Sequence, residues 1–269
     1  MRLGIGSWTY GWATGVSGYP LPAHPLTAID LIDRAHQYGL DIVQIADNMA
    51  AHELSPGQIT TLRDHAEELG IAIELGTVGV EHAHLRRYLK LASTLGTRLV
   101  RTLIQTSGEN PDLTHAESCI RAVEEEFRSA GVVLAIENYE QQPCAELASL
   151  VARIGSPFVG ICLDTVNSLG ALETPRQVVA MLGRFVQNLH IKDFTIRRVQ
   201  SRMGYEVLGC PAGEGDLEID WILSELEKHG NNPSMILEQW TPWTGNIDST
   251  IATEEAWALR SVEFLRRYH

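Results

Sequence analysis

The sequence predicts an α/β protein, a single-domain (β/α)8 TIM barrel that spans residues 1–269. Three observations lead to this fold class. Eight short apolar segments alternate with eight longer amphipathic segments, a glycine follows most of the amphipathic ones, and the chain has the length of one such barrel. An open, doubly wound parallel sheet is the alternative architecture for the same alternation.

The apolar segments are predicted to be strands. They are rich in valine, isoleucine and leucine and show little alternation with polar residues, which is typical of parallel strands covered on both faces. In chain order they are Leu3–Trp8, Ile42–Ala46, Ile71–Val78, Leu99–Ile104, Val132–Glu137, Val159–Asp164, Val186–Lys192 and Met235–Trp240.

The amphipathic segments are predicted to be helices. The first, 26–39, places Ile29, Ile32 and Ala35 on one face, and the second, 55–70, begins with a Ser-Pro start signal. The others are 81–95, 114–130, 144–154, 174–183, 216–229 and 249–267. A glycine just past the last turn, as a left-handed helix stop requires, recurs at positions 39, 70, 96, 131 and 230.

One connection is much longer than the others. Phe194–Gly215 follows the seventh predicted strand, whereas strand–helix connections in such folds usually take about 2–6 residues. A loop of this length more often has a functional role than none. It is also compatible with a homodimer.

Composition and charge argue against a nucleic-acid partner. The formal net charge is −13, and the arginine-rich stretches are only the pairs 86–87, 197–198 and 266–267. A nucleic-acid partner is therefore not expected, because binding to phosphate calls for a basic surface.

No targeting or membrane segment is expected. The first residues lack the apolar stretch of a signal peptide, and no apolar run approaches the ~18 residues of a membrane span. The four cysteines form no C-x-x-C pair and no disulfide framework. The expected location is the cytoplasm, without a membrane partner.

Four chemically similar side chains stand at the ends of four consecutive predicted strands. They are Glu137, Asp164, His190 and Glu238. Active sites of barrels lie at the carboxyl ends of the strands, so these ends should converge. Three carboxylates and one imidazole suit Mn²⁺ first, with Mg²⁺, Co²⁺, Fe²⁺ or Zn²⁺ as alternatives. Taken singly, each residue is explained as well by a helix cap, an ion pair or a core histidine.

Further side chains are candidates for contact with a substrate. Lys192 lies two residues after His190, on the same side of an extended strand, and Arg198 lies in the long loop. Arg101 interrupts a buried strand and needs an acidic partner. Trp8 and Trp240 stand near strand ends and could form the walls of a sugar pocket, although aromatic residues at strand ends more often belong to the core.

Other polar residues near strand ends receive simpler interpretations. Asp47 and Asn48 close the second strand and are expected to line the pocket. His82 and His84 have a spacing that does not converge on a helix, so a surface position is expected.

The segments AIEN, CLDTVN, LHIKD, PAGEGDLEIDW and ILEQW resemble the xylose isomerase-like superfamily of barrels, also called the sugar phosphate isomerase/epimerase family. The resemblance is firm over strands five to eight and looser over the whole chain. It implies a metal held by Glu137, Asp164, His190 and Glu238. The segment from His190 to Gly215 resembles more closely the branch that contains 3-oxo-isoapionate decarboxylase.

One departure from the family separates its branches. Asn167 stands where the endonuclease IV members carry a zinc-binding histidine and where ketose 3-epimerases tend to carry a substrate-contacting histidine. Asn167 is itself a candidate substrate-binding residue. The change argues against a DNA repair enzyme, and it sets the chain apart from the epimerase branch.

The expected function is a divalent-metal-dependent isomerase or epimerase of a small polyhydroxy ketone or aldehyde. Glu137 and Glu238 would act as an acid–base pair through a metal-stabilised enediolate. The alternative is a metal-dependent lyase, a decarboxylase or dehydratase, acting on a 3-oxo sugar acid or keto-polyol. An endonuclease and a non-catalytic barrel rank below both. In each enzymatic case the partner is a small carbohydrate-like molecule.

Overall fold

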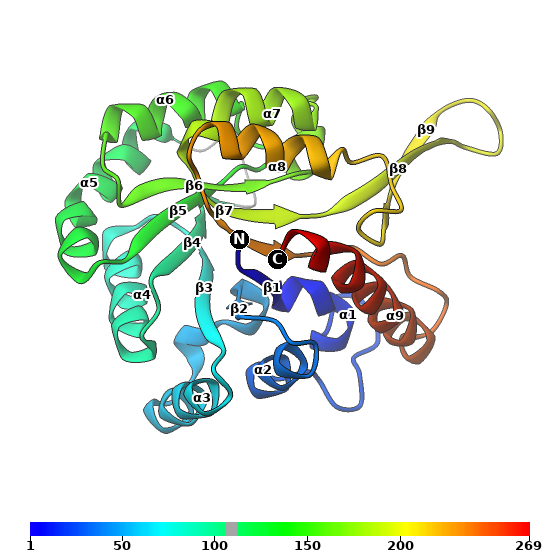
Figure 1. The fold of residues 1–269 in the computed structure, drawn as a ribbon, viewed down its shortest axis with the longest axis horizontal. Helices are drawn as coiled ribbons and strands as arrows, with labels where there is room; N and C mark the ends of the chain where they lie inside the picture. The colour runs from blue at the N-terminus through cyan, green and yellow to red at the C-terminus, as the bar shows by residue number, and fades with distance from the viewer. Residues whose placement is uncertain (106–111) are drawn as a thin grey trace.

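The computed structural model describes residues 1–105 and 112–269. Its centre is a closed barrel of eight parallel strands in the order β1-β10-β7-β6-β5-β4-β3-β2, surrounded by helices (Figure 1). The strands are β1 (Leu3–Gly6), β2 (Ile42–Ile45), β3 (Ala72–Val78), β4 (Leu99–Leu103), β5 (Val133–Glu137), β6 (Val159–Asp164), β7 (Val186–Ile191) and β10 (Ser234–Leu237). The predicted fold class is confirmed, and the open sheet is ruled out.

The short α1 was not predicted, and the other helices follow the predicted segments to within about three residues at each end. They are α1 (Gly11–Thr14), α2 (Ala28–Gln37), α3 (Pro56–Leu69), α4 (His82–Leu95), α5 (Leu113–Ala130), α6 (Cys144–Ile154), α7 (Pro175–Leu182), α8 (Ile219–Lys228) and α9 (Ile247–Leu265). Thr27, Ser55 and Thr174 cap the amino ends of α2, α3 and α7 through reciprocal capping boxes. The five predicted glycine stops all have positive φ.

Two predicted strands are shorter than expected at their carboxyl ends. β1 stops at Gly6, whose N–H donates to the hydroxyl of Thr9 (2.9 Å), so Trp8 lies in the 3-10 helix η1 (Ser7–Tyr10). β10 stops at Leu237, and the following Gln239 side chain donates to backbone carbonyls outside the sheet. Tertiary hydrogen bonds therefore decide where these strands end.

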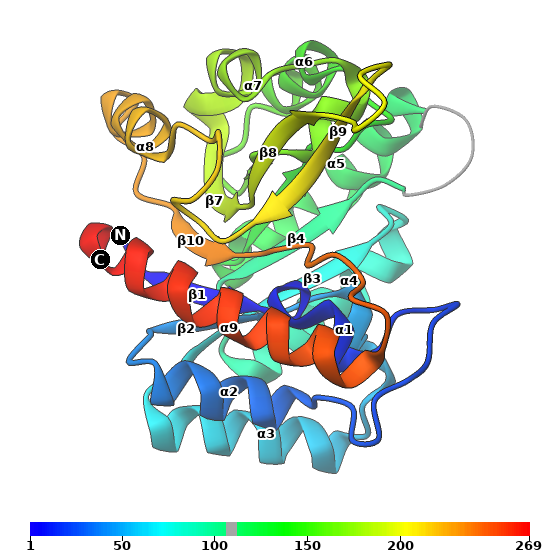
Figure 2. The same ribbon diagram turned by 90° about the vertical axis from the view of Figure 1, so that its right-hand side faces the viewer.

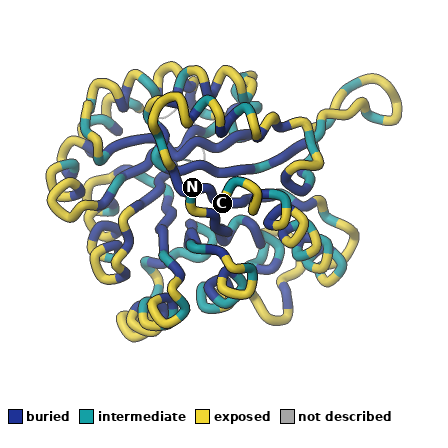
Figure 3. The backbone as a smooth tube through the Cα atoms, viewed as in Figure 1, coloured by how far each residue is buried: buried dark blue, intermediate teal, exposed yellow. Residues whose placement is uncertain are grey.

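The segment predicted as a long loop is largely a β-hairpin. β8 (Asp193–Arg198) pairs antiparallel with β9 (Tyr205–Cys210), and the pair projects away from the barrel (Figures 1 and 2). Its alternation of apolar and polar residues, such as Phe194-Thr195-Ile196 in β8, is too short to stand out in the sequence. Much of the hairpin is exposed, while the barrel strands are buried (Figure 3). The homodimer stays a prediction.

The base of the hairpin is fixed by one aspartate. The carboxylate of Asp193 accepts N–H groups of Gly213, Gly215 and Leu217 at 2.8, 3.1 and 3.0 Å. A Cβ atom at Gly215 would lie 2.2 Å from Asp193 Oδ1, so the close approach requires glycine. The PAGEG stretch thereby holds the connection to α8 against the barrel.

Across the described residues, every helix is too short or too polar to cross a membrane.

Candidate active site

The four predicted ligands lie together at the carboxyl end of the barrel. Glu137 ends β5, Asp164 ends β6, His190 is in β7, and Glu238 follows β10 directly. All four side chains are buried, and one ligand atom from each lies within 4.8 Å of the others. β7 has neighbours β6 and β10 in register, with Asp164 opposite His190, which explains the convergence.

The two carboxylate oxygens of Asp164 have different roles, one in a turn and one in the cluster. Its Oδ1 accepts the N–H groups of Val166 and Asn167, both at 2.8 Å, as a turn former does. Its Oδ2 faces the cluster, where Lys192 Nζ lies at 2.7 Å. One oxygen therefore shapes the backbone, and the other remains available for chemistry.

Gln44 orients the ring of His190 from the side that faces away from the carboxylates. Its Nε2 lies 2.8 Å from Gln44 Oε1, and the amide of Gln44 donates to Glu74 and Asn188, which fixes that oxygen as an acceptor. Nε2 therefore carries a hydrogen. Nδ1 then faces the carboxylates, 3.5 Å from Glu137 and 3.3 Å from Glu238. Such outer partners hold metal-binding histidines in place.

The partners of Gln44 form a polar layer across the barrel interior. Asn188 donates to Glu74 (3.0 Å) and to the hydroxyl of Ser234 (2.8 Å), which in turn donates to Glu74. Burial raises the pKa of Glu74, and hydrogen bonds from Ser234 and Gln44 partly offset the effect. This layer was not predicted, although polar residues inside apolar strands were its visible signal.

Two cations complete the cluster. Arg101 lies 2.6 Å from Glu137 Oε2 and 2.9 Å from Asp47 Oδ1, and Lys192 lies 2.8 Å from Glu238 Oε2. Burial alone would lower the pKa of Lys192, but its carboxylate neighbours outweigh burial and raise it well above the ordinary value. Burial would raise the pKa of Glu137, yet Arg101 and His190 lower it to about 2. Both groups are charged at neutral pH.

The charges and free atoms of the cluster suit a divalent cation. Four carboxylates, those of Asp47 and the three acidic ligands, face two permanent cations, so one divalent ion would balance the charge once His190 is neutral and Asp164 is ionised. Burial would lower the pKa of His190, but Glu238 and Glu137 outweigh it and raise the pKa, and burial raises the pKa of Asp164. His190 Nδ1 and Glu238 Oε1 are buried without a hydrogen bond among the described residues, whereas Glu137 Oε2 and Asp164 Oδ2 are held only by their ion pairs with the two cations. Oxygen and imidazole donors together suit Mg²⁺, Mn²⁺ and their neighbours. The cluster is consistent with a divalent metal site.

A cavity of about 210 Å³ opens beside the cluster. Its walls include predicted residues and two that were missed, Leu103 and Tyr139. Tyr139 follows Glu137 by two positions, a spacing that could have revealed it. The lining residues are Trp8, Asp47, Arg101, Leu103, Glu137, Tyr139, Asn167, Lys192 and Glu238.

The side chain of Asn167 forms hydrogen bonds with two other residues that line this cavity. Its Nδ2 donates to Glu137 Oε1 (2.9 Å), and its Oδ1 accepts from Lys192 Nζ (3.4 Å). The side chain therefore positions a carboxylate and an ammonium group at once, beyond the substrate contact that was predicted.

Two predicted substrate residues lie elsewhere. Arg198 is exposed on β8, where its guanidinium donates to the carbonyl of Arg202 and to the hydroxyl of Tyr205. Trp240 packs against the hairpin base, since a Cβ atom at Gly209 would lie 2.5 Å from the Trp240 carbonyl oxygen. Neither residue lines the cavity.

The expectation for the two histidines of α4 is half right. His82 is exposed. His84 is partly buried, because its Nε2 contacts Thr77 Oγ1 at 2.7 Å and its ring packs on Tyr88. Its environment is a tertiary contact that helix spacing alone does not reveal.

Comparison with known proteins identifies the family of this chain and a similar enzyme. Residues 32–268 match the family described as xylose isomerase-like TIM barrel. The 3-oxo-isoapionate decarboxylase of Pectobacterium atrosepticum is 34% identical over 98% of this chain and 95% of its own length.

Solved structures share the fold at low identity. D-psicose 3-epimerase from Clostridium cellulolyticum, with D-tagatose, has a TM-score of 0.74 at 17% identity and covers 100% of this chain and 99% of its own. A xylose isomerase-like protein from Mycobacterium smegmatis in complex with magnesium has a TM-score of 0.71 at 15% identity, covering 97% of each chain.

Proposed function

The chain belongs to the xylose isomerase-like TIM barrel family, and we propose that it is a metal-dependent lyase that decarboxylates a 3-oxo sugar acid. The observation that carries the proposal is the 34% identity to a 3-oxo-isoapionate decarboxylase along nearly the whole of both chains. This choice reverses the order expected from the sequence, in which isomerisation came first and the lyase was the alternative.

The cavity has the charges that a sugar acid requires. Arg101 and Lys192 both line it, and both are held between carboxylates that keep them protonated. A substrate carboxylate can pair with Lys192, whose side chain is the more exposed of the two at 15%. The walls formed by Trp8, Leu103 and Tyr139 limit the access of water.

A divalent ion, for which Mn²⁺ is the first choice, would be held by Glu137, Asp164, His190 and Glu238. When bound, it would supply Lewis-acid stabilisation of the negative charge that develops at the ketone. The carbon–carbon bond to the carboxylate breaks, its electron pair stays on the carbon beside the ketone, and CO₂ leaves. Lys192, which lines the cavity as an ammonium group, donates a proton to that carbon and regains one from solvent. Glu137 is ionised and has no proton to give.

Isomerisation or epimerisation is the second candidate, because one observation favours it. Glu137 and Glu238 approach His190 Nδ1 at similar distances and thus flank one point, as a pair of acid–base carboxylates would. The ionised state of Glu137 suits the role of base.

One experiment separates the two candidates. Protein loaded with Mn²⁺ is incubated in D₂O with 3-oxo sugar acids and, in parallel, with ketoses, and the products are followed by NMR and CO₂ detection. Release of CO₂ with one deuterium at the new C–H bond supports the lyase. Deuterium exchange into recovered ketoses without CO₂ release would replace the lyase with an isomerase.

A further inference from the structure

A second cluster of metal-binding side chains lies between the amino ends of α4 and α5. Glu81 immediately precedes α4, His82 begins it, and His115 and Cys119 lie one turn apart on α5. Residues four apart on a helix share a face, so His115 and Cys119 both point toward Glu81. None of the four belongs to the active site described above.

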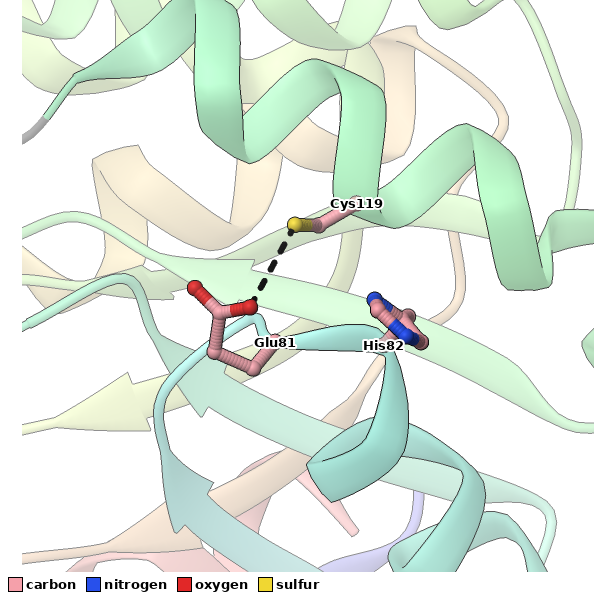
Figure 4. Close-up of side chains that lie close together, drawn as sticks. All are labelled: Glu81, His82 and Cys119. Carbon is pink, nitrogen blue, oxygen red and sulfur yellow. Dashed lines mark hydrogen bonds between the residues drawn. The ribbon is translucent and has the colours of Figure 1, made fainter.

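Three of the four residues have distances that approach those of a metal site, and His115 lies outside that group but contacts Glu81 and Cys119. Glu81, His82 and Cys119 each place a ligand atom within 4.8 Å of the others, and Figure 4 shows the three side chains with the contact between Cys119 and Glu81. Cys119 Sγ lies 3.8 Å from Glu81 Oε2 and 3.5 Å from His115 Nε2. Bonds of about 2.0–2.3 Å in a tetrahedron separate ligands by roughly 3.3–3.8 Å.

The orientation of Glu81 is unusual for its position. It occupies the N-cap of α4 but its side chain makes no capping hydrogen bond. Instead, its Oε1 contacts His115 Nε2 at 2.6 Å, across the gap between the two helices. A local capping role therefore does not explain the side chain, whereas a link between helices does.

We propose that Glu81, His82, His115 and Cys119 form a second metal site, which binds Zn²⁺ and clasps the amino ends of α4 and α5. Thiolate and imidazole ligands select a borderline-soft ion, in contrast to the oxygen-rich active site. Four protein ligands leave no open coordination position, which is the pattern of a structural site.

Binding would release a proton from the thiol. Burial and the nearby Glu81 raise the pKa of Cys119, so the metal-free sulfur is a thiol. Glu81 raises the pKa of His115 by accepting its hydrogen bond, and a metal would replace that hydrogen too.

Cobalt titration of the full chain tests the site, because only a thiolate ligand gives the sulfur-to-cobalt charge-transfer band. The active-site ligands contain no sulfur, but Cys162 lies close to Glu137 and His190 and is the rival thiol. We expect the band in wild type and in Cys162→Ala, and its loss in Cys119→Ser. Absence of the band in wild type, or its persistence in Cys119→Ser, would overturn the proposal.

Because Cys119 is buried, its replacement risks misfolding, so a second variant at a more exposed ligand is also tested. His115 is half exposed, so His115→Ala should fold, and it should weaken cobalt and zinc binding by at least about tenfold, as loss of even an outer partner does. The matched control is His36→Ala, at an exposed position on α2. Equal affinities in wild type and His115→Ala would exclude His115 and, with it, the four-ligand site. This outcome is independent of the decarboxylase assay.

Discussion

At the scale of single residues, Lys192 is the proton donor in the proposed decarboxylation. It is the protonated group of the cavity that contacts both Asp164 and Glu238. We expect Lys192→Met to reduce turnover of a 3-oxo sugar acid by about 10²–10⁴-fold, the contribution typical of a positioned proton donor. The measurement is the rate of CO₂ release, with Lys228→Met on the surface of α8 as control. Unchanged turnover would remove Lys192 from the mechanism.

Asn167 offers a subtler test at the same scale. Its amide contacts Glu137 and Lys192, so Asn167→Ala should leave both charged groups less well positioned. A fall in kcat of about tenfold or more is expected, with less effect on KM, since positioning acts in the transition state. Asn167→Asp should be worse than Asn167→Ala, because it adds a carboxylate beside Glu137. Equal rates for wild type and both variants would contradict the positioning role.

At the scale of elements, the contact between α1 and α9 should make stability depend on pH. Glu254 of α9 accepts the N–H groups of Trp12 and Ala13 at 2.9 and 3.0 Å. Burial raises its pKa to about 7, although those backbone donors oppose the rise. The folded state thus keeps this proton to higher pH than the unfolded chain, and its stability falls as pH rises from about 4.5 to 7.

The size of that effect can be measured by substitution. Relative to Glu254→Gln, the free energy of unfolding of wild type should fall by up to about 3 kcal/mol across this pH window. Urea unfolding at several pH values gives the comparison, and Glu263→Gln, exposed on the same helix, is the control. A difference that does not vary with pH would show that Glu254 titrates normally.

The base of the hairpin gives a second test at this scale. Gly215→Ala would place a methyl group against Asp193 and the carbonyl of Phe194, so we expect a loss of about 1–3 kcal/mol in unfolding free energy. Gly57→Ala is the matched control, because no atom lies within 4 Å of the added Cβ there. If both variants melt at the same temperature, the close approach at Gly215 is relaxed in solution.

At the scale of the whole molecule, removal of the metal should lower stability. Without a cation, the carboxylates of Glu137, Asp164 and Glu238 repel one another inside the barrel. Adding Mg²⁺ at about 100 times its dissociation constant should stabilise the chelator-treated protein by about 2.7 kcal/mol. Mg²⁺ is the informative ion, because it disfavours the thiolate cluster at Cys119. Glu238→Gln should show a smaller thermal shift, and an equal shift would place the ion elsewhere.

The fold was predictable because its signals are local. Apolar runs, helix caps and glycine stops each act within a few residues, and together they gave every barrel strand. Polar side chains at strand ends predicted the cluster, since parallel strands of a barrel end on one rim. The hairpin was missed because its alternation of apolar and polar residues covers only a few positions and is interrupted by Arg197 and Arg198. Arg198 and Trp240 lie outside the cavity, since the hairpin carries one and packs against the other.

The polar layer beneath His190 has a consequence for how this sequence can diverge. Gln44, Glu74, Asn188 and Ser234 belong to four different strands, yet they share one set of hydrogen bonds that ends on the imidazole. A replacement at Gln44 alone would leave buried donors and acceptors without hydrogen-bond partners. Mutational effects at these positions should therefore be strongly epistatic. A substitution of Gln44 on β2 should preserve stability only when compensating substitutions occur on β3 or β7.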